Sequence, residues 1–256
     1  MRSDAVTDMG ADALAAADAR STHRRGLTLA LLTLTYFFSY MDRQILAILQ
    51  ELIKADLKLS DTQLGLLSGL AFAVFYATLG IPVARLADRF NRRNIIAVSL
   101  AVWSLMTALG GLAQNFAQLL AARIGVGIGE AGSSPPSHSI IADLYPPEER
   151  AGAMGIYSLG VVLGAAIGTF LGGTIASFYG WRVAMFAIGL PGVALAVIVY
   201  LFVVEPRRGM ADRRTDAGRG AMPSLVDGFR AMAISAPAFH LVMAVTLTSM
   251  IGYGLT

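Results

Sequence analysis

The stretch LTLALLTLTYFFSYMDRQILAIL, residues 27–49, is a long apolar run that carries two adjacent charges, Asp42 and Arg43. It exceeds the roughly 20 residues that a helix needs to cross the hydrocarbon core of a bilayer. A charged side chain that faces lipid costs at least about 2.5 kcal/mol. We therefore expect Tyr40-Met41-Asp42-Arg43 to face the interior of a helical bundle or a watery cavity, with the rest of the chain forming its wall.

The composition of the chain is that of a protein with several membrane-crossing helices. Of its 256 residues, 55% are hydrophobic and 14% are charged, and the mean hydropathy is +0.62. Soluble domains carry about 25% charged residues. The net charge of +3 gives little support for a nucleic-acid partner, and no disulfide is expected because the chain contains no Cys. We expect an all-α membrane protein.

Six apolar spans of near-crossing length are separated by short polar segments. They are residues 27–49, 62–84, 95–113, 117–141, 152–176 and 183–204, and a seventh begins near Ala238. This pattern predicts a flexible cytoplasmic tail (1–26), a six-helix bundle (27–204), a basic cytoplasmic linker (205–236) and the start of a seventh helix (237–256). Within the linker, residues 225–232 form an apolar patch. It is either an amphipathic helix on the inner leaflet or part of a solvated linker.

The Lys and Arg residues gather on one side of these spans. With the N-terminus in the cytoplasm, fifteen of the twenty fall on the cytoplasmic side. Only Lys54, Lys58 and Arg182 fall on the other side, and two more lie inside spans. Because short cytoplasmic loops carry the excess of positive charge, we expect a cytoplasmic N-terminus. The Arg-, Ala- and Gly-rich composition favours a bacterial inner membrane.

The fourth span contributes the remaining intramembrane charges, Arg123 and Glu130. Seven residues make two helical turns, so both side chains project from one face. At about 1.5 Å per residue in a core of about 30 Å, Asp42 and Arg123 lie at nearly the same depth. We therefore expect Asp42 to meet Arg123 and Arg43 to reach Glu130 across one cavity. The alternative is a static ion pair that aids assembly, although intramembrane charges usually mark a functional site.

Three other patterns have mainly structural explanations. Gly127 to Gly132 spells G-x-G-x-x-G, but no strand precedes it, so it is not a dinucleotide fingerprint. Glycines at 160, 164, 168 and 172 form a stripe that favours close helix packing. His138 either titrates near neutral pH or is a packed residue. The sequence contains no H-E-x-x-H, no G-x-S-x-G and no thiol, so we expect neither an enzyme nor a cofactor nor a metal site.

The loop after the second span is the most specific motif in the chain. It reads Gly80-Ile-Pro-Val-Ala84-Arg-Leu-Ala-Asp88-Arg89-Phe-Asn91-Arg92-Arg93. This resembles the G-x-x-x-D-R-x-G-R-R motif of the major facilitator superfamily, with Ala and Asn in place of two glycines. The Asn, the Tyr-Met-Asp-Arg segment and the Gly-Glu-Ala segment of the fourth span are similar to the spinster-like branch. A conformational latch is expected from the following residues: Asp88, Arg89, Arg92 and Asp143.

The resemblance implies the N-terminal half of a twelve-helix transporter, built from two inverted three-helix repeats, with the C-terminal half as the missing partner. It further implies alternating-access transport of an amphipathic lipid, of the lysophospholipid or sphingoid-phosphate type, driven by protons. Proton coupling then falls to Asp42 and Glu130. The expected substrate-binding residues are Arg43, Arg123, Tyr36, Tyr40 and Phe75, although these aromatic side chains equally suit contact with membrane lipids.

Two other functions remain open on the sequence. A superfamily transporter of a small organic anion or a drug would keep most of these motifs. A structural or receptor-like bundle is also compatible with the composition, but it gives no reason for two carboxylates and two Arg residues to converge within the membrane.

Overall fold

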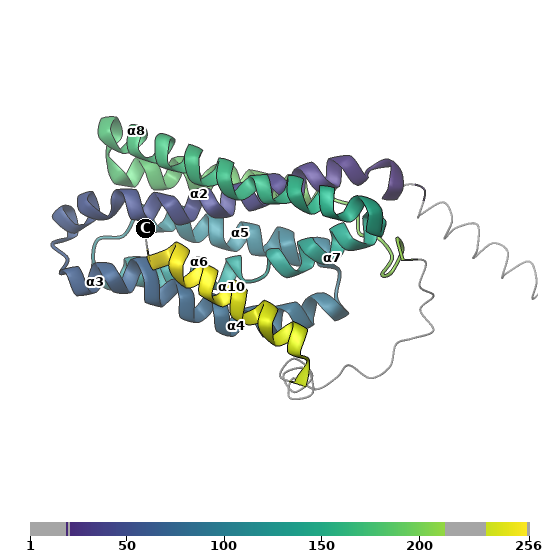
Figure 1. The fold of residues 1–256 in the computed structure, drawn as a ribbon. Coiled ribbons are helices and arrows are strands. Elements are labelled where there is room, and N and C mark those ends of the chain that lie inside the picture. The colour runs from purple at the N-terminus through teal and green to yellow at the C-terminus, as the bar shows by residue number, and fades with distance from the viewer. Residues whose placement is uncertain (1–18, 20, 213–233, 255–256) are drawn as a thin grey trace, which may run out of the picture. The chain divides into compact units, whose positions relative to one another are not determined.

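The computed structural model describes residues 19, 21–212 and 234–254 of the chain. It divides into two units, residues 1–214 and 215–256, which are considered separately. The first unit contains α2 (Arg25–Leu57), α3 (Asp61–Gly65), η1 (Leu66–Leu70), α4 (Ala71–Arg89), α5 (Arg92–Gly110), α6 (Phe116–Glu130), α7 (Ser134–Leu144) and α8 (Pro147–Phe202) (Figure 1). The second contains α10 (Ala236–Gly254). The expected all-α fold class is confirmed.

Short polar side chains set where several helices begin. Ser60 caps α3 in a capping box: its Oγ accepts from the N–H of Gln63 at 3.3 Å, and its own N–H donates to Oε1 of Gln63 at 2.9 Å. Asn91 caps α5 by accepting from the N–H of Asn94 at 3.0 Å, and Asn115 caps α6 in the same way. These caps satisfy amide groups that have no partner within the helix.

The expected fourth span is divided between α6 and α7. The two helices are separated by the turn Ala131–Ser133, just ahead of Pro135 and Pro136. Proline carries no N–H to donate to the preceding turn, so a regular helix cannot continue through this pair without a break. The break leaves Glu130 at the last residue of α6.

Helix α8 consists of two helical arms that meet at a kink at Gly180, where φ is +83°. On the first arm, the predicted glycine stripe packs against α2, and a Cβ at Gly164 would lie 2.3 Å from the carbonyl oxygen of Phe37. On the second arm, Gly189 and Gly192 lie against α5. The stripe therefore acts as predicted, by allowing backbones to approach closely.

Three helical stretches of the described chain are long and apolar enough to cross a membrane: Asp61–Arg89, Arg92–Gly110 and Pro147–Phe202. The last contains the expected fifth and sixth spans as its two arms. The number of crossings therefore stays a prediction. The tail 1–18 and the linker patch 225–232 lie outside the described residues.

Buried charges occupy two separate places in this otherwise apolar unit. Asp42, Arg123 and Glu130 lie between α2 and α6, and Arg92 lies at the start of α5. Because a buried charge is costly unless it is paired, both places require partners from other helices. The two places coincide with the transport cluster and the latch expected from the sequence.

Candidate functional site

Arg43 and Glu130 form the tighter of two ion pairs between α2 and α6. Nη2 of Arg43 lies 2.6 Å from Oε2 of Glu130, and Nε donates to the same oxygen at 2.7 Å. The hydroxyl of Ser39, one turn earlier on α2, donates to that oxygen at 3.0 Å. One carboxylate oxygen, Oε2, therefore accepts every hydrogen bond that the Glu130 side chain receives from the described residues.

Asp42 and Arg123 form the looser pair. Oδ2 of Asp42 lies 3.6 Å from Nη1 of Arg123, and Oδ1 accepts a hydrogen bond from the hydroxyl of Thr107 on α5. Both ion pairs expected from helix depth are thus present. Adjacent residues of α2 reach opposite charges two turns apart on α6.

Three members of the cluster are buried, the Arg43 side chain is 17% exposed, and several buried polar atoms of the cluster make no hydrogen bond. Asp42 is 2% exposed, Arg123 3% and Glu130 1%. Among the described residues, Oδ2 of Asp42, Nε of Arg123 and Oε1 of Glu130 have no hydrogen-bond partner. An unsatisfied buried polar group costs about 1–3 kcal/mol or more if charged. Each carboxylate therefore retains one oxygen that can receive a proton or another donor.

Aromatic rings surround the two Arg side chains. The guanidinium carbon of Arg43 lies 5.0 Å from each ring centroid of Tyr40, Phe72 and Tyr76. That of Arg123 lies 5.6 Å from the ring of Phe72. Tyr40 was predicted from the sequence, whereas Phe72 and Tyr76 of α4 were not. Their spacing of four residues, one turn of a helix, was the available signal.

The remaining predicted side chains lie at different distances from the charges. The ring of Tyr36 packs edge-on against Tyr40 and stacks on Tyr157, with centroids 5.1 and 4.4 Å apart. His138 makes an edge contact with Tyr157 at 5.1 Å. Phe75, on α4, lies beside Gly127 of α6. Tyr36 therefore extends the aromatic group around Arg43, and His138 reaches that group through Tyr157.

The expected latch is centred on Arg92, which is 0% exposed. Arg92 pairs with Asp143 at the end of α7 and donates from Nη1 to Oγ of Ser139 at 2.8 Å. It also donates from Nε to Oε1 of Glu205 at 2.7 Å and from Nη2 to the carbonyl of Pro206 at 2.7 Å. Glu205, three residues beyond the end of α8, was not predicted from the sequence.

The two other latch residues do not join this group. Asp88 lies 4.0 Å from Nη1 of Arg208, and Arg89 is exposed at the end of α4. Arg208 also donates to the carbonyl of Ala87 at 2.6 Å. Of the four expected latch residues, only Arg92 and Asp143 pair with each other; Glu205 is the second partner of Arg92, and Asp88 faces Arg208 in the segment after α8.

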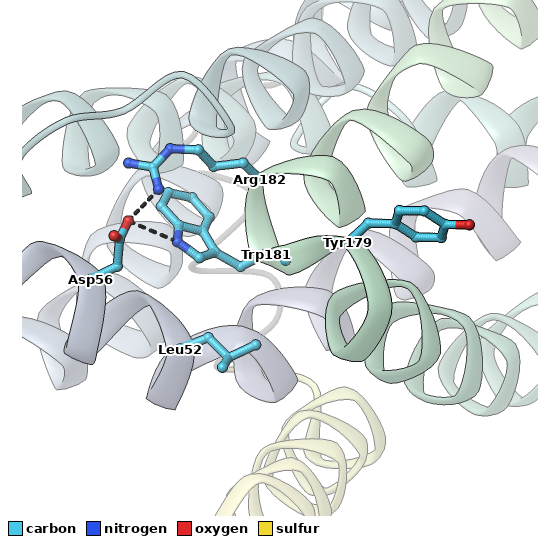
Figure 2. Close-up of a pocket in the computed structure, with 6 residues that line it drawn as sticks. Leu52, Asp56, Tyr179, Trp181 and Arg182 are labelled. Carbon is cyan, nitrogen blue, oxygen red and sulfur yellow. Dashed lines mark hydrogen bonds and ion pairs between the residues drawn. The ribbon is translucent and has the colours of Figure 1, made fainter.

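A second polar group lies at the kink of α8, away from the four-charge cluster. A pocket of about 290 Å³ is lined by Leu52, Asp56, Tyr179, Gly180, Trp181 and Arg182. Figure 2 shows Asp56 accepting from Nε1 of Trp181, at 3.1 Å, and pairing with Arg182. The hydrogen bond from Arg182, and then that from Trp181, lower the pKa of the Asp56 carboxyl from its ordinary value.

The pairing at Asp56 joins three parts of the bundle. Arg182 also donates from Nη2 to the carbonyl of Ala113, after α5, at 2.9 Å, and its guanidinium carbon stands 4.2 Å from the ring centroid of Trp181. Nearby, the hydrogen bond to Asp61 raises the pKa of Lys54. This end of α2 is therefore fastened to α5 and to the kink of α8.

Comparison with known proteins places this geometry in a family. The chain matches the Major Facilitator Superfamily over residues 32–256. It is similar to two crystal structures of a bacterial homologue of the human lysosomal transporter Spinster, both inward-facing. The unoccupied form is 37% identical with a TM-score of 0.76, covering 91% of this chain and 54% of that one. The occupied form is 40% identical with a TM-score of 0.70, covering 77% and 48%.

Curated relatives include transporters with different described cargoes. The chain is 36% identical over 244 residues to an MFS-type efflux pump of Mycolicibacterium smegmatis, covering 94% of this chain and 54% of that protein. It is 30% identical over 185 residues to a probable L-galactonate transporter of Escherichia coli, covering 71% and 41%. The chain spans about half the length of the curated relatives it matches.

The chain belongs to the Major Facilitator Superfamily, and its structural relatives include a bacterial spinster homologue. The superfamily is one of integral membrane transporters. The expected superfamily and its spinster-like character are confirmed.

Proposed function

We propose that this chain forms part of a proton-coupled secondary active transporter that moves an amphipathic lipid with an anionic headgroup by alternating access. The observation that carries the proposal is the buried four-charge cluster of Asp42, Arg43, Arg123 and Glu130, in which each carboxylate keeps one oxygen without a hydrogen bond. Four buried charges are costly for a purely structural bundle. They suit a site in which the ion pairs rearrange when a proton or a substrate binds.

Protonation supplies the change of pairing. In this conformation Glu130 is held by Arg43 through Oε2, and Oε1 is open to a proton. A proton on Glu130 removes the charge that retains Arg43, so the guanidinium becomes available to an anion. Protonation of Asp42 would release Arg123 in the same way. Their separation of 3.6 Å makes them the weaker pair.

The cargo is inferred from the surroundings of the charges. Arg suits a phosphate because its planar fork can donate two parallel hydrogen bonds. Tyr36 and Tyr40 lie beside Arg43 and Phe75 lies on α4, so these rings would contact the apolar part of the cargo. A lysophospholipid or a sphingoid phosphate combines the two features. Membrane lipids and protons are the other partners.

The latch and the membrane orientation belong to the same proposal. Arg92 joins α5, α7 and the segment after α8, so it would hold these ends together in one conformational state. Asp143 and Glu205 would complete the latch as the partners of Arg92. The charge distribution supports a cytoplasmic position for this end, with the protein in a bacterial inner membrane.

The test is uptake of a fluorescent lysophosphatidic acid by proteoliposomes that contain the intact transporter, driven by an imposed pH gradient. We expect Asp42→Asn and Glu130→Gln to abolish proton-driven uptake while the purified variants remain folded, with the helical content of the wild type. Arg123→Ala should weaken headgroup binding. The exposed-site variant Glu51→Gln is the control. Full uptake with the normal pH profile in both carboxylate variants would overturn the coupling assignment.

A second candidate cargo is a small organic anion, or a drug. The described cargoes of the relatives favour keeping it: one is an efflux pump and another a probable L-galactonate transporter. The same proteoliposomes distinguish the two. An excess of galactonate should leave lysophosphatidic acid uptake unchanged if the cargo is a lipid. Competition by galactonate, with no competition by dodecyl phosphate, would establish the small-anion alternative.

A further inference from the structure

Arg43 lies inside a socket of three aromatic rings. Its guanidinium carbon is 5.0 Å from each ring centroid of Tyr40, Phe72 and Tyr76. One ring comes from α2, next to Arg43 itself, and two come from α4. An Arg cation is attracted to the face of an aromatic ring, more strongly when the group is desolvated. The Arg43 side chain is 17% exposed, so the contacts are largely protected from solvent.

The socket and Glu130 hold Arg43 in the same position. Nε and Nη2 of Arg43 face Oε2 of Glu130 while the guanidinium contacts the rings. The ring of Phe72 also faces Arg123 at 5.6 Å, so one apolar side chain touches the cations of both ion pairs. The rings therefore stabilise the paired arrangement in addition to the carboxylates.

Helix α4 carries both of these rings and begins at an irregular turn. It follows η1, a π-helical turn over Leu66–Leu70, and such turns are rare and occur frequently at functional sites. A Cβ added at Gly65 or Gly69 would meet no atom within 4 Å. The glycine side of this segment is therefore unpacked, whereas Leu67 is buried in the core, and Phe72 and Tyr76 lie two and six residues beyond the end of η1.

We propose that Phe72 and Tyr76 are positioning residues that hold Arg43 on Glu130, and that displacement of α4 releases Arg43 to an anionic headgroup. The inference rests on the proposed function of the four-charge cluster. It implies that the position of α4 determines whether Arg43 pairs with Glu130 or binds the anion. In the paired state, the rings compete with the anion for the same guanidinium.

Competition predicts a tighter, not weaker, ligand complex when a ring is removed. The probe is radiolabelled dodecyl phosphate, measured at equilibrium on the intact transporter in nanodiscs with empty nanodiscs subtracted. Tyr76→Leu should bind the probe roughly fivefold more tightly, the change expected for losing one cation–π contact of about 1 kcal/mol. Its maximal uptake rate should fall, because Arg43 returns to Glu130 less readily. Tyr76→Phe keeps the ring and should restore wild-type affinity.

Matched variants separate this role from a loss of folding. Phe72→Leu provides a second test at the other ring of α4, and Phe170→Leu, which removes a 71% exposed ring from α8, is the control. A general packing defect would weaken binding, whereas release of Arg43 strengthens it. Unchanged or weaker binding in both Tyr76→Leu and Phe72→Leu, with folded protein, would overturn the positioning role.

One further variant separates failure of this inference from failure of the proposed function. Arg43→Gln should lose dodecyl phosphate binding while dodecanol partitions as in the wild type. Wild-type affinity in Arg43→Gln would refute the headgroup assignment itself. Loss of binding in Arg43→Gln, together with wild-type affinity in Tyr76→Leu and Phe72→Leu, would refute only the positioning role of the two rings.

Discussion

Arg123 and Glu130 lie two turns apart on α6 and pair with consecutive residues of α2, Asp42 and Arg43. The pairing is unequal. The Arg43–Glu130 contact is 2.6 Å, and the Asp42–Arg123 contact is 3.6 Å. The close pair therefore fixes α2 against α6, and the open pair is the easier one to rearrange.

Removing one side of the close pair should cost more than removing both sides. Arg43→Met leaves Glu130 charged and buried, which we expect to lower the free energy of unfolding by about 3–5 kcal/mol. The double variant Arg43→Met/Glu130→Leu should recover most of that loss because no lone charge remains. Denaturant titration in a mild detergent measures both. Equal losses in the single and double variants would show that Glu130 is not stabilised by Arg43.

The latch predicts unequal roles for two Arg residues three positions apart. Arg92→Ala leaves Asp143 and Glu205 without their shared cation, and we expect a loss of about 3 kcal/mol in unfolding free energy. This value lies at the low end of the range for breaking a buried ion pair, because both carboxylates are partly exposed. Arg89→Ala, at an exposed site, should change stability by less than about 0.5 kcal/mol. Similar melting temperatures for the two variants would contradict this assignment.

The glycine stripe predicts opposite effects for the same substitution on one helix. Gly164→Ala places a Cβ 2.3 Å from the carbonyl oxygen of Phe37, and the overpacking should destabilise the protein by about 1–3 kcal/mol. Gly152→Ala meets no atom within 4 Å and should be neutral or stabilising by up to about 1 kcal/mol. Melting temperatures of the two variants provide the measurement. A neutral Gly164→Ala would mean that α2 and α8 are not in close contact.

The contacts of Asp56 with Arg182 and Trp181 predict an acid-dependent contribution to stability. Because Arg182 and Trp181 lower the pKa of Asp56 in the folded protein, the stabilisation is complete well above the unfolded value of about 3.9. It is lost as the pH falls through the lower folded value. The melting-temperature gap between wild type and Asp56→Asn should therefore shrink as the pH drops below about 4.

The control for the Asp56 experiment is Glu51→Gln, which removes an exposed negative charge from the same helix. It corrects for the change in net charge across the titration. A gap between wild type and Asp56→Asn that is constant from neutral to strongly acidic pH would show that the ionised carboxylate does not hold the kink of α8.

The sequence was sufficient for features that follow from helix period and depth. Asp42, Arg43, Arg123 and Glu130 stand in apolar spans, and a seven-residue spacing fixes the last two on one face, so the pairing could be predicted. Glu205 could not be assigned to Arg92, because 113 residues separate them and the contact depends on how α8 ends beside α5.

The aromatic socket could be predicted only in part, because the four-residue spacing of Phe72 and Tyr76 places both rings on one helix face without fixing what that face contacts. Rings at 72 and 76 in an apolar span suit lipid contact as well as the interior. Only the rotation of α4 about its axis, which packing determines, directs them towards Arg43. The division of the fourth span, by contrast, was signalled by Pro135 and Pro136, and the six-crossing topology remains a prediction.

The two carboxylates and two guanidiniums at the α2–α6 contact cancel one another. A proton alone, or a monoanion alone, would leave this buried centre with one net charge in a medium of low dielectric. Together they restore neutrality. Under the proposed function, a loaded state with one proton for each negative charge of the headgroup therefore crosses without carrying charge through the membrane field, which acts at about 2.3 kcal/mol per elementary charge per 100 mV. Uptake should accordingly follow the pH gradient and be insensitive to voltage.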